Sequence, residues 1–192
     1  SHSHLLIYDS EFDDEVASFR HGLECVRSYI RSGAETAGPF MTFQQVLNQG
    51  HSKDPDVEVL GDDCAFLLYT AGTTGAPKGV MMSHNGLMWN AVNWVHAGVY
   101  DENDLSLQVF PLYHVAALCS VLTYIYLGGT LYLKKFFDPR DCMETIMREG
   151  ITRWAAAPTV FSMILQLPDI ERYDTRSLAT LGSGAAVMPL AL

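Results

Sequence analysis

The sequence is short of positive charge. Among 192 residues, 12 lysines and arginines face 22 aspartates and glutamates, which gives a formal net charge of −10 and a sequence pI near 5.0. A protein that holds nucleic acid electrostatically needs a basic face. The composition therefore argues against nucleic acid as a partner, although one locally positive loop could still bind a single nucleotide.

Cysteine is also scarce. The four cysteines are Cys25, Cys64, Cys119 and Cys142, and no two of them form a C-x-x-C pair, so the spacing of a zinc site is absent. We expect reduced, mostly buried thiols in a cytoplasmic protein. The opening residues lack the pattern of a secretory signal peptide, and we find no internal repeat.

Charged residues are missing altogether from Leu105 to Leu133, a run long enough to span a bilayer. Pro111, His114 and the pair Gly128-Gly129 interrupt this run. We therefore predict no transmembrane segment but two buried elements joined at the glycines, a helix over residues 116–127 and a strand over residues 130–136.

Elsewhere the pattern alternates between strands and helices, which predicts an α/β fold with mostly parallel sheets flanked by helices. The strand over residues 64–70 has a continuous apolar run, so we expect it to be buried on both sides. Further strands are predicted over residues 5–9, 25–30, 151–157 and 177–186. Helices are predicted over residues 11–22, 42–49, 139–149 and 158–167, and after Ser83 with Leu87, Met88, Ala91, Val92 and Val95 on one face.

Two smaller patterns have simple interpretations. The acidic run Asp101–Asp104 resembles a cation loop but lacks the glycine and the distal glutamate of an EF-hand, so we expect a solvated turn. Tyr124, Tyr126 and Tyr132 are expected to be core and strand residues, and Trp89 and Trp94 are expected to pack in the same way.

The stretch "YTAGTTGAPKGVMMSH", residues 69–84, concentrates unusual chemistry. Glycines let backbone N–H groups approach an anion closely. Three threonines add hydroxyl donors, and Lys78 adds a mobile positive charge, while Pro77 stiffens the turn before it. Together these residues suit a polyphosphate.

The Walker-type phosphate loop, G-x-x-x-x-G-K-[ST], does not fit this stretch. Counted from Gly72, its second glycine falls at Pro77, and Gly79 stands where serine or threonine should follow Lys78. A Rossmann G-x-G-x-x-G is also absent from the loop. A glycine-rich hairpin or linker would explain the glycines but not the hydroxyls and the lysine.

Residues 69–80, "YTAGTTGAPKGV", closely resemble the phosphate-loop signature of the adenylate-forming superfamily, which includes acyl-CoA synthetases, luciferases and peptide-synthetase adenylation domains. The usual form has serine where this chain has Ala71, which removes one hydroxyl. "PLYH" (residues 111–114) is similar to the family's aromatic-histidine motif beside the acyl pocket. "GSGAA" (residues 182–186) is similar to its glycine-rich strand end along the adenine. The longer stretches "LYHVAAL" and "GSGAAVMP" favour the fatty-acyl-CoA and related acyl-CoA ligases.

The resemblance implies a two-step reaction. A carboxylate attacks the α-phosphorus of ATP to give an acyl-adenylate and pyrophosphate, and a thiol, usually that of coenzyme A, then displaces AMP. Positioning and charge stabilisation do most of the work in such chemistry. Lys78 and His114 are implied as catalytic residues, with His114 shaping the acyl and adenylate site. The implied nucleotide-binding residues are Thr70, Ala71, Gly72, Thr73, Thr74, Gly75, Lys78, Ser183, Gly184 and Ala185.

The resemblance covers essentially the whole chain, and we expect residues 1–192 to be a single fragment of the AMP-binding N-terminal domain of a longer protein. The family's Mg²⁺-binding glutamate, in a YGxTE segment, and its C-terminal catalytic lysine would then lie outside these residues. The fragment alone is expected to be inactive. Implied ligands are ATP with Mg²⁺, a carboxylic acid and coenzyme A. The resemblance is compatible with a homo-oligomer and with peripheral membrane contact.

Three interpretations stay open. The first is part of an acid–thiol ligase, the second a non-catalytic nucleotide- or acyl-binding module, and the third a phosphotransfer NTPase, which Pro77 and Gly79 disfavour. For the acid, a fatty acid is the first choice and an aryl acid the second, and adenylation of an amino acid also remains an alternative.

Overall fold

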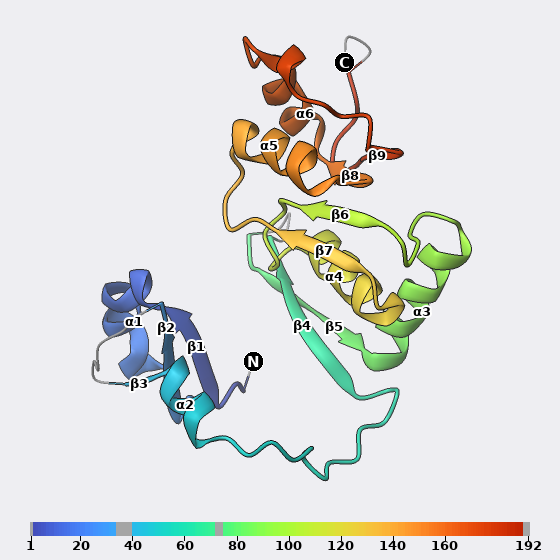
Figure 1. The fold of residues 1–192 in the computed structure, drawn as a ribbon. Helices are drawn as coiled ribbons and strands as arrows, with labels where there is room; N and C mark the ends of the chain where they lie inside the picture. Colours follow the sequence, from blue (N-terminus) through green and yellow to red (C-terminus); the bar gives the residue numbers. More distant parts are fainter. Residues whose placement is uncertain (1, 34–39, 72–74, 190–192) are drawn as a thin grey trace. The chain divides into compact units, whose positions relative to one another are not determined.

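The computed structural model describes residues 2–33, 40–71 and 75–189 (Figure 1). The chain separates into two compact units, Ser1–Val57 and Glu58–Leu192. None of the helices among the described residues has the length and apolar character that a membrane crossing requires.

The first unit is built on a parallel sheet with the strand order β1-β2-β3. A capping box at Thr42 and Gln45 begins α2, which ends before Gly50 as predicted. The second strand was predicted too early, because residues 23–26 form a turn in which the backbone N–H of Val26 donates to Leu23 O over 3.1 Å. The elements are β1 (Leu5–Asp9), η1 (Ser10–Phe12), α1 (Asp13–Phe19), η2 (Arg20–Gly22), β2 (Ser28–Ser32), β3 (Met41–Thr42) and α2 (Phe43–Gln49).

The second unit opens with an antiparallel hairpin of β4 (Cys64–Thr70) and β5 (Lys78–Ser83). The bounds of β4 match the prediction, but its environment does not, since most residues of β4 are exposed. The prediction of a strand buried on both sides is therefore wrong. Among the described residues β4 pairs with β5 alone. Its continuous apolar run therefore does not mark β4 as a central strand of a parallel sheet.

A four-stranded parallel sheet forms the body of the second unit, with the order β7-β6-β8-β9 (Figure 1). Helices connect its strands, with α3 and α4 packed together on one face and α5 and α6 on the other. The α/β fold with parallel sheets flanked by helices is thus confirmed. The elements are α3 (His84–His96), β6 (Leu105–Gln108), α4 (Val115–Leu127), β7 (Thr130–Leu133), α5 (Pro139–Glu149), β8 (Arg153–Ala156), α6 (Pro158–Leu165), η3 (Ile170–Arg172) and β9 (Thr180–Ser183).

Local sequence signals set several of these boundaries. Ser83 caps α3, because its Oγ accepts a hydrogen bond from Gly86 N over 3.1 Å. Of the five residues predicted to form the apolar face of α3, Met88 alone is exposed. Gly128, with φ of 70°, ends α4 in the left-handed conformation. The uncharged run therefore does consist of separate elements joined at the glycines, as predicted.

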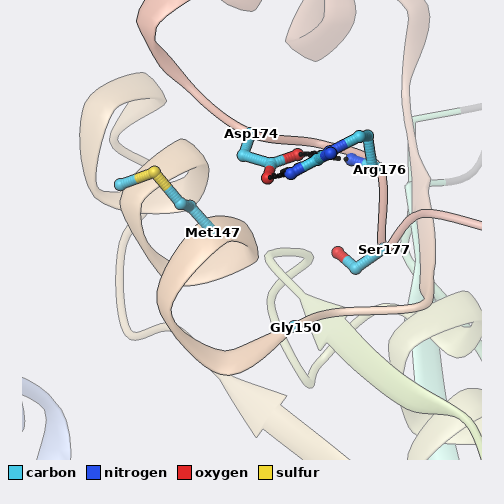
Figure 2. Close-up of a pocket in the computed structure, with 5 residues that line it drawn as sticks. All are labelled: Met147, Gly150, Asp174, Arg176 and Ser177. Carbon is cyan, nitrogen blue, oxygen red and sulfur yellow. Dashed lines mark hydrogen bonds and ion pairs between the residues drawn. The ribbon is translucent and has the colours of Figure 1, made fainter.

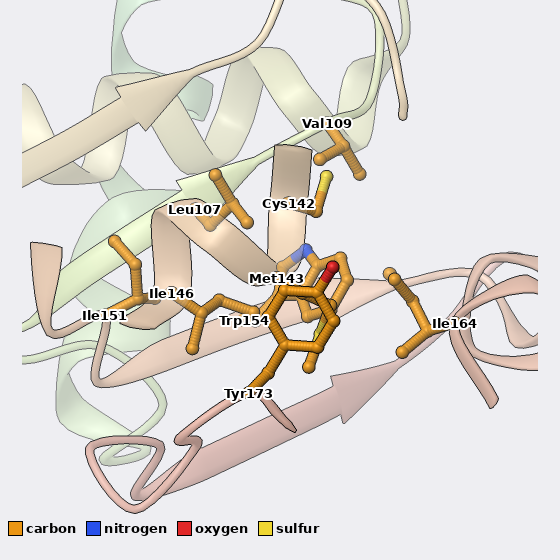
Figure 3. Close-up of a cluster of buried hydrophobic side chains, with 10 residues drawn as sticks. Leu107, Val109, Cys142, Met143, Ile146, Ile151, Trp154, Ile164 and Tyr173 are labelled. Atoms are coloured by element: carbon orange, nitrogen blue, oxygen red, sulfur yellow. The ribbon is translucent and has the colours of Figure 1, made fainter. Parts of the chain in front are cut away.

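The core of the second unit lies between α5 and the sheet (Figure 3). Side chains of α5, among them Cys142 and Ile146, face Leu107 of β6 and Trp154 of β8. Burial raises the pKa of the Cys142 thiol to about 11, so this thiol stays protonated and behaves as a small apolar group.

Three predictions about burial fail. Cys25 and Cys64 are exposed, because one lies in the turn before β2 and the other at the start of the hairpin. Trp89 and Trp94 are also exposed, although the Trp94 ring contacts Tyr100 edge-on at 6.1 Å between centroids. Tyr126, predicted as a core or strand residue, is exposed on α4.

The acidic run does form a turn with Asp101, Glu102 and Asn103 exposed, as predicted. Asp104 alone is largely buried, because Arg153 Nε donates to its Oδ2 over 2.6 Å.

We predict that Trp154→Ala lowers the free energy of unfolding by about 3–5 kcal/mol, because a 2% exposed ring would leave a cavity in the core. The matched control is Trp89→Ala, whose 64% exposed ring should matter by less than about 0.5 kcal/mol. Urea unfolding followed by circular dichroism measures both. Equal losses from the two variants would contradict this placement of the core.

Candidate functional site

The predicted phosphate loop lies at the tip of the β4–β5 hairpin. Thr70 and Lys78 face each other as the last pair of the ladder, and Thr70 Oγ1 donates to Lys78 O over 3.5 Å. The residues between them form the connection, of which Gly72, Thr73 and Thr74 lie outside the described residues. Since Thr70 and Lys78 begin and end the loop, the hairpin brings these two candidates together.

Gly75 and Gly79 of the loop are each glycine for a different structural reason. Gly75 has φ of 96°, a conformation that residues with a Cβ rarely adopt, and a Cβ placed there would meet no atom within 4 Å. Gly79 lies under the hairpin side chains, and its Cβ would come within 3.0 Å of Leu67 Cδ1. Gly75 therefore serves the turn, whereas Gly79 serves close packing.

Lys78 is exposed and forms no ion pair with any described carboxylate. Its ammonium group can therefore meet an anion without first leaving another partner. Ala71 is also exposed and sits beside Thr70 at the start of the loop. The described ends of the loop thus present an exposed threonine and an exposed positive charge.

The second group of candidates lies at the carboxyl edge of the parallel sheet. β6 lies between β7 and β8, so the chain leaves β6 toward one side and later returns on the other. Such a reversal of strand order is where open α/β sheets bind ligands. The connection after β6 holds His114, and the one after β9 holds Gly184 and Ala185, so the topology places both at this edge.

His114 stands at the start of α4. Its backbone N–H donates to Pro111 O over 3.0 Å, and its carbonyl accepts from Leu118 N over 3.1 Å. The imidazole makes no capping hydrogen bond, is exposed, and lies 4.7 Å from the Tyr113 ring, centroid to centroid. The backbone is therefore held firmly while the ring remains free to contact a ligand.

The end of β9 is shaped by its small residues. A Cβ on Gly182 would lie 3.2 Å from Ala155 Cβ, so glycine allows β9 and β8 to approach closely. Gly184 N donates to Ala156 O over 3.4 Å. Ala185 has φ of 67°, the single positive value among the described non-glycine residues, and turns the chain away from the sheet.

A groove of about 570 Å³ opens beside this strand end. Its walls are mainly apolar side chains of α5, β8, α6 and β9, and its rim includes Gly182, Ser183 and Met188. Sequence reasoning missed this groove, because its lining comes from five elements spread over residues 143–188. Ser183 is the predicted site residue that borders it.

A second cavity, of about 340 Å³, lies near the start of β8 and is more polar (Figure 2). Asp174 and Arg176 line it and form an ion pair of 2.6 Å. The hydrogen bonds from the Arg176 side chain and backbone lower the pKa of Asp174 to about 2. The ion pair leaves these two residues without net charge above that pH, and the cavity contains no residue predicted for the site.

The sequence comparisons agree with the resemblance drawn from the motifs. A model of the family described as "AMP-binding enzyme" matches residues 1–192. Feruloyl-CoA synthase of Amycolatopsis sp is 36% identical over 144 residues, which are 74% of this chain and 29% of that protein. Long-chain-fatty-acid–CoA ligase of Bacillus subtilis (strain 168) is 36% identical over 132 residues, which are 67% of this chain and 23% of that protein.

The fold also matches solved structures. The inhibitor-bound N-terminal domain of FACL13 from Mycobacterium tuberculosis matches with a TM-score of 0.87 and 27% identity, over 100% of this chain and 47% of that chain. The predicted relationship to acyl-CoA ligases is thereby confirmed. The matched residues cover less than a third of the length of both relatives given above.

Gly75→Ala should destabilise the hairpin tip, by about 1 kcal/mol, because a Cβ opposes the left-handed backbone. Gly184→Ala is the matched control, since that position is equally open but lacks a positive φ. Chemical denaturation and hydrogen exchange in the hairpin measure the effect. A loss at Gly184 as large as that at Gly75 would refute the backbone explanation.

Proposed function

Because the chain belongs to the AMP-binding enzyme family, we propose that the protein containing it is an ATP-dependent carboxylic acid–CoA ligase. The proposed reaction converts an acid and ATP into an acyl-adenylate and pyrophosphate, and then forms acyl-CoA and AMP. We propose this activity for the whole protein and expect residues 1–192 alone to be inactive, in line with the small share of the relatives' length that they span.

The observation that carries the proposal is the hairpin tip. Lys78, which pairs with no carboxylate in the part of the chain that the structure describes, closes a loop that is rich in glycine and threonine. Polyphosphates are bound by such combinations of backbone N–H groups, hydroxyls and a mobile cation. The hairpin explains how the chain can present this loop without the strand-to-helix geometry of a Walker motif.

The roles of the residues follow from this position. Lys78 and Thr70 would hold the β- and γ-phosphates and neutralise charge as pyrophosphate leaves. His114, exposed at the sheet edge, would shape the acyl and adenylate site, and the end of β9 with Ser183, Gly184 and Ala185 would line the adenine. No three described His, Cys, Asp or Glu side chains cluster into a metal site, and the main Mg²⁺ ligand is expected outside residues 1–192.

For the acid we propose a fatty acid first and an aryl acid second. The apolar groove beside Ser183 is consistent with either. One of the relatives above is named for a long-chain fatty acid and the other for feruloyl-CoA. Product formation with a series of fatty acids and with ferulate, at equal concentrations, separates the two classes.

The test of the proposed function is exchange of labelled pyrophosphate into ATP by the whole protein. We expect exchange that depends on a carboxylic acid and needs no coenzyme A. Lys78→Ala should lower the exchange rate at least about tenfold, because a charge-assisted contact to the departing pyrophosphate is lost. Lys53→Ala removes the same charge from an exposed connecting residue and should leave the rate unchanged. Acid-independent ATP hydrolysis without exchange would contradict the ligase.

Ala71→Ser restores the serine that the family's phosphate loop usually has at this position, and so tests whether the missing hydroxyl matters for ATP binding. It adds a hydroxyl beside Thr70, at an exposed position with room for it, and should strengthen ATP binding about two- to fivefold through one further hydrogen bond. Titration calorimetry of both proteins with ATP measures the change. Ala71→Val is the control that adds bulk without a hydrogen-bond donor, and an equal gain in that variant would rule out a phosphate contact.

A further inference from the structure

His114 lies at the end of the connection between β6 and α4, and the α4 end of that connection is held by the helix. His114 O accepts from Leu118 N over 3.1 Å, in the first turn of α4. Four side chains of α4 are buried: Ala117, Ser120, Thr123 and Tyr124. Since the helix fixes one end of the connection, the place of His114 depends on what fixes the other end.

The β6 end of the connection depends on the side chain of Gln108. Gln108 is the last residue of β6 and is only 5% exposed. Strand pairing stops here, so the next backbone N–H groups need a different acceptor. Gln108 Oε1 supplies one, because it accepts from Phe110 N over 2.9 Å. Pro111 follows and has no N–H to donate, so the side chain fixes the backbone just before the turn at residues 111–114.

The backbone of Gln108 is in turn held by the sheet and the core. Gln108 pairs with Leu133 of β7, and its O accepts from Lys134 N over 3.0 Å. The next residue, Val109, is buried in the same core cluster as Cys142 (Figure 3). The Gln108 side chain therefore starts from a fixed point, and its length sets where Phe110 N lies.

Packing contributes little beyond this point. Residues 111–114 are all exposed, and the Tyr113 ring is 74% exposed. His114 N donates to Pro111 O over 3.0 Å, so these four residues form one turn. A shift of the backbone at Phe110 would therefore be passed to His114 with the whole turn, because no core contact absorbs it within these exposed residues.

From this arrangement we propose that Gln108 is a positioning residue for the reaction, which sets the place of His114 through the N–H of Phe110. The proposal rests on the proposed function, in which His114 shapes the acyl and adenylate site. Gln108 acts through the turn and contacts no substrate. The phosphates of ATP are assigned to Thr70 and Lys78 on a separate element, the β4–β5 hairpin. Loss of Gln108 should therefore impair use of the carboxylic acid more than use of ATP.

Two substitutions in the whole protein separate positioning from stability. Gln108→Glu keeps an oxygen acceptor at the same reach, whereas Gln108→Met has a similar length and no comparable acceptor. Burial of a carboxylate costs more stability than burial of a thioether, so the urea midpoint should be lower in Gln108→Glu. Acid-dependent pyrophosphate exchange should show the opposite order, with Gln108→Glu close to the unmodified protein and Gln108→Met about three- to tenfold slower.

The kinetic constants show which substrate is affected. In Gln108→Met the KM for the carboxylic acid should rise and kcat should fall, while the KM for ATP changes less than about twofold. Thr123→Val is the matched control, because it removes another buried hydrogen bond, from Thr123 Oγ1 to Cys119 O over 2.7 Å. That variant should change neither constant for the acid by more than about twofold.

His114→Ala supplies the background that tests the route of the effect. If Gln108 acts through His114, adding Gln108→Met to His114→Ala should slow pyrophosphate exchange by less than about a further twofold, because the group that it positions is gone. Losses that multiply in the double variant would overturn the proposal. So would a rate of pyrophosphate exchange that follows the urea midpoint, with Gln108→Glu slower than Gln108→Met.

Hydrogen exchange of the whole protein measures the anchor without any activity. The backbone N–H groups of residues 110–114 should exchange faster in Gln108→Met than in Gln108→Glu, because the acceptor for Phe110 N is lost in the first variant only. Equal hydrogen exchange in the two variants would overturn the anchor. If the unmodified protein shows no acid-dependent pyrophosphate exchange, the ligase is refuted, and the difference in hydrogen exchange still decides whether Gln108 holds the turn.

Discussion

The parallel pairing of β6 with β7 on one side and β8 on the other is the constraint on which the second unit depends. Ser106, Leu107 and Gln108 of β6 are all buried, and Gln108 satisfies its buried polar groups through Lys134 N and Phe110 N. Because β6 is central and its neighbours run in the same direction, the connections after all four strands meet at one edge. The exposed imidazole of His114 and the turn at Ala185 reach solvent there for this reason.

The hairpin obeys a different constraint. Antiparallel pairing lets a short connection reverse the chain, so Thr70 and Lys78 can lie opposite each other although eight positions separate them. The left-handed backbone of Gly75 belongs to the same reversal. The sheet edge and the hairpin tip thus present their polar groups through two unrelated local geometries, one set by parallel strands and one by a turn.

Local signals made much of this fold predictable. Helix starts at Thr42, Ser83 and Asp138, and helix ends at Gly128 and Gly150, depend on neighbours within a few residues. One failure, the early start predicted for β2, reflects a local turn at residues 23–26, whereas others involve distant partners. The exposure of β4 and the ion pair of Asp104 with Arg153 are decided by elements that the local sequence cannot reveal. The loop motif was likewise visible in the sequence, whereas the groove and the carboxylate partners of seven described cations could be found only from the fold.

The central claim is that the hairpin tip holds a polyphosphate. Hydrogen exchange of the whole protein, with and without ATP and Mg²⁺, tests it most directly. The account predicts slower exchange of the backbone N–H groups in residues 69–80, and loss of that protection in Lys78→Ala but not in Lys53→Ala. Unchanged exchange across residues 69–80 at saturating ATP, with protection elsewhere, would contradict it.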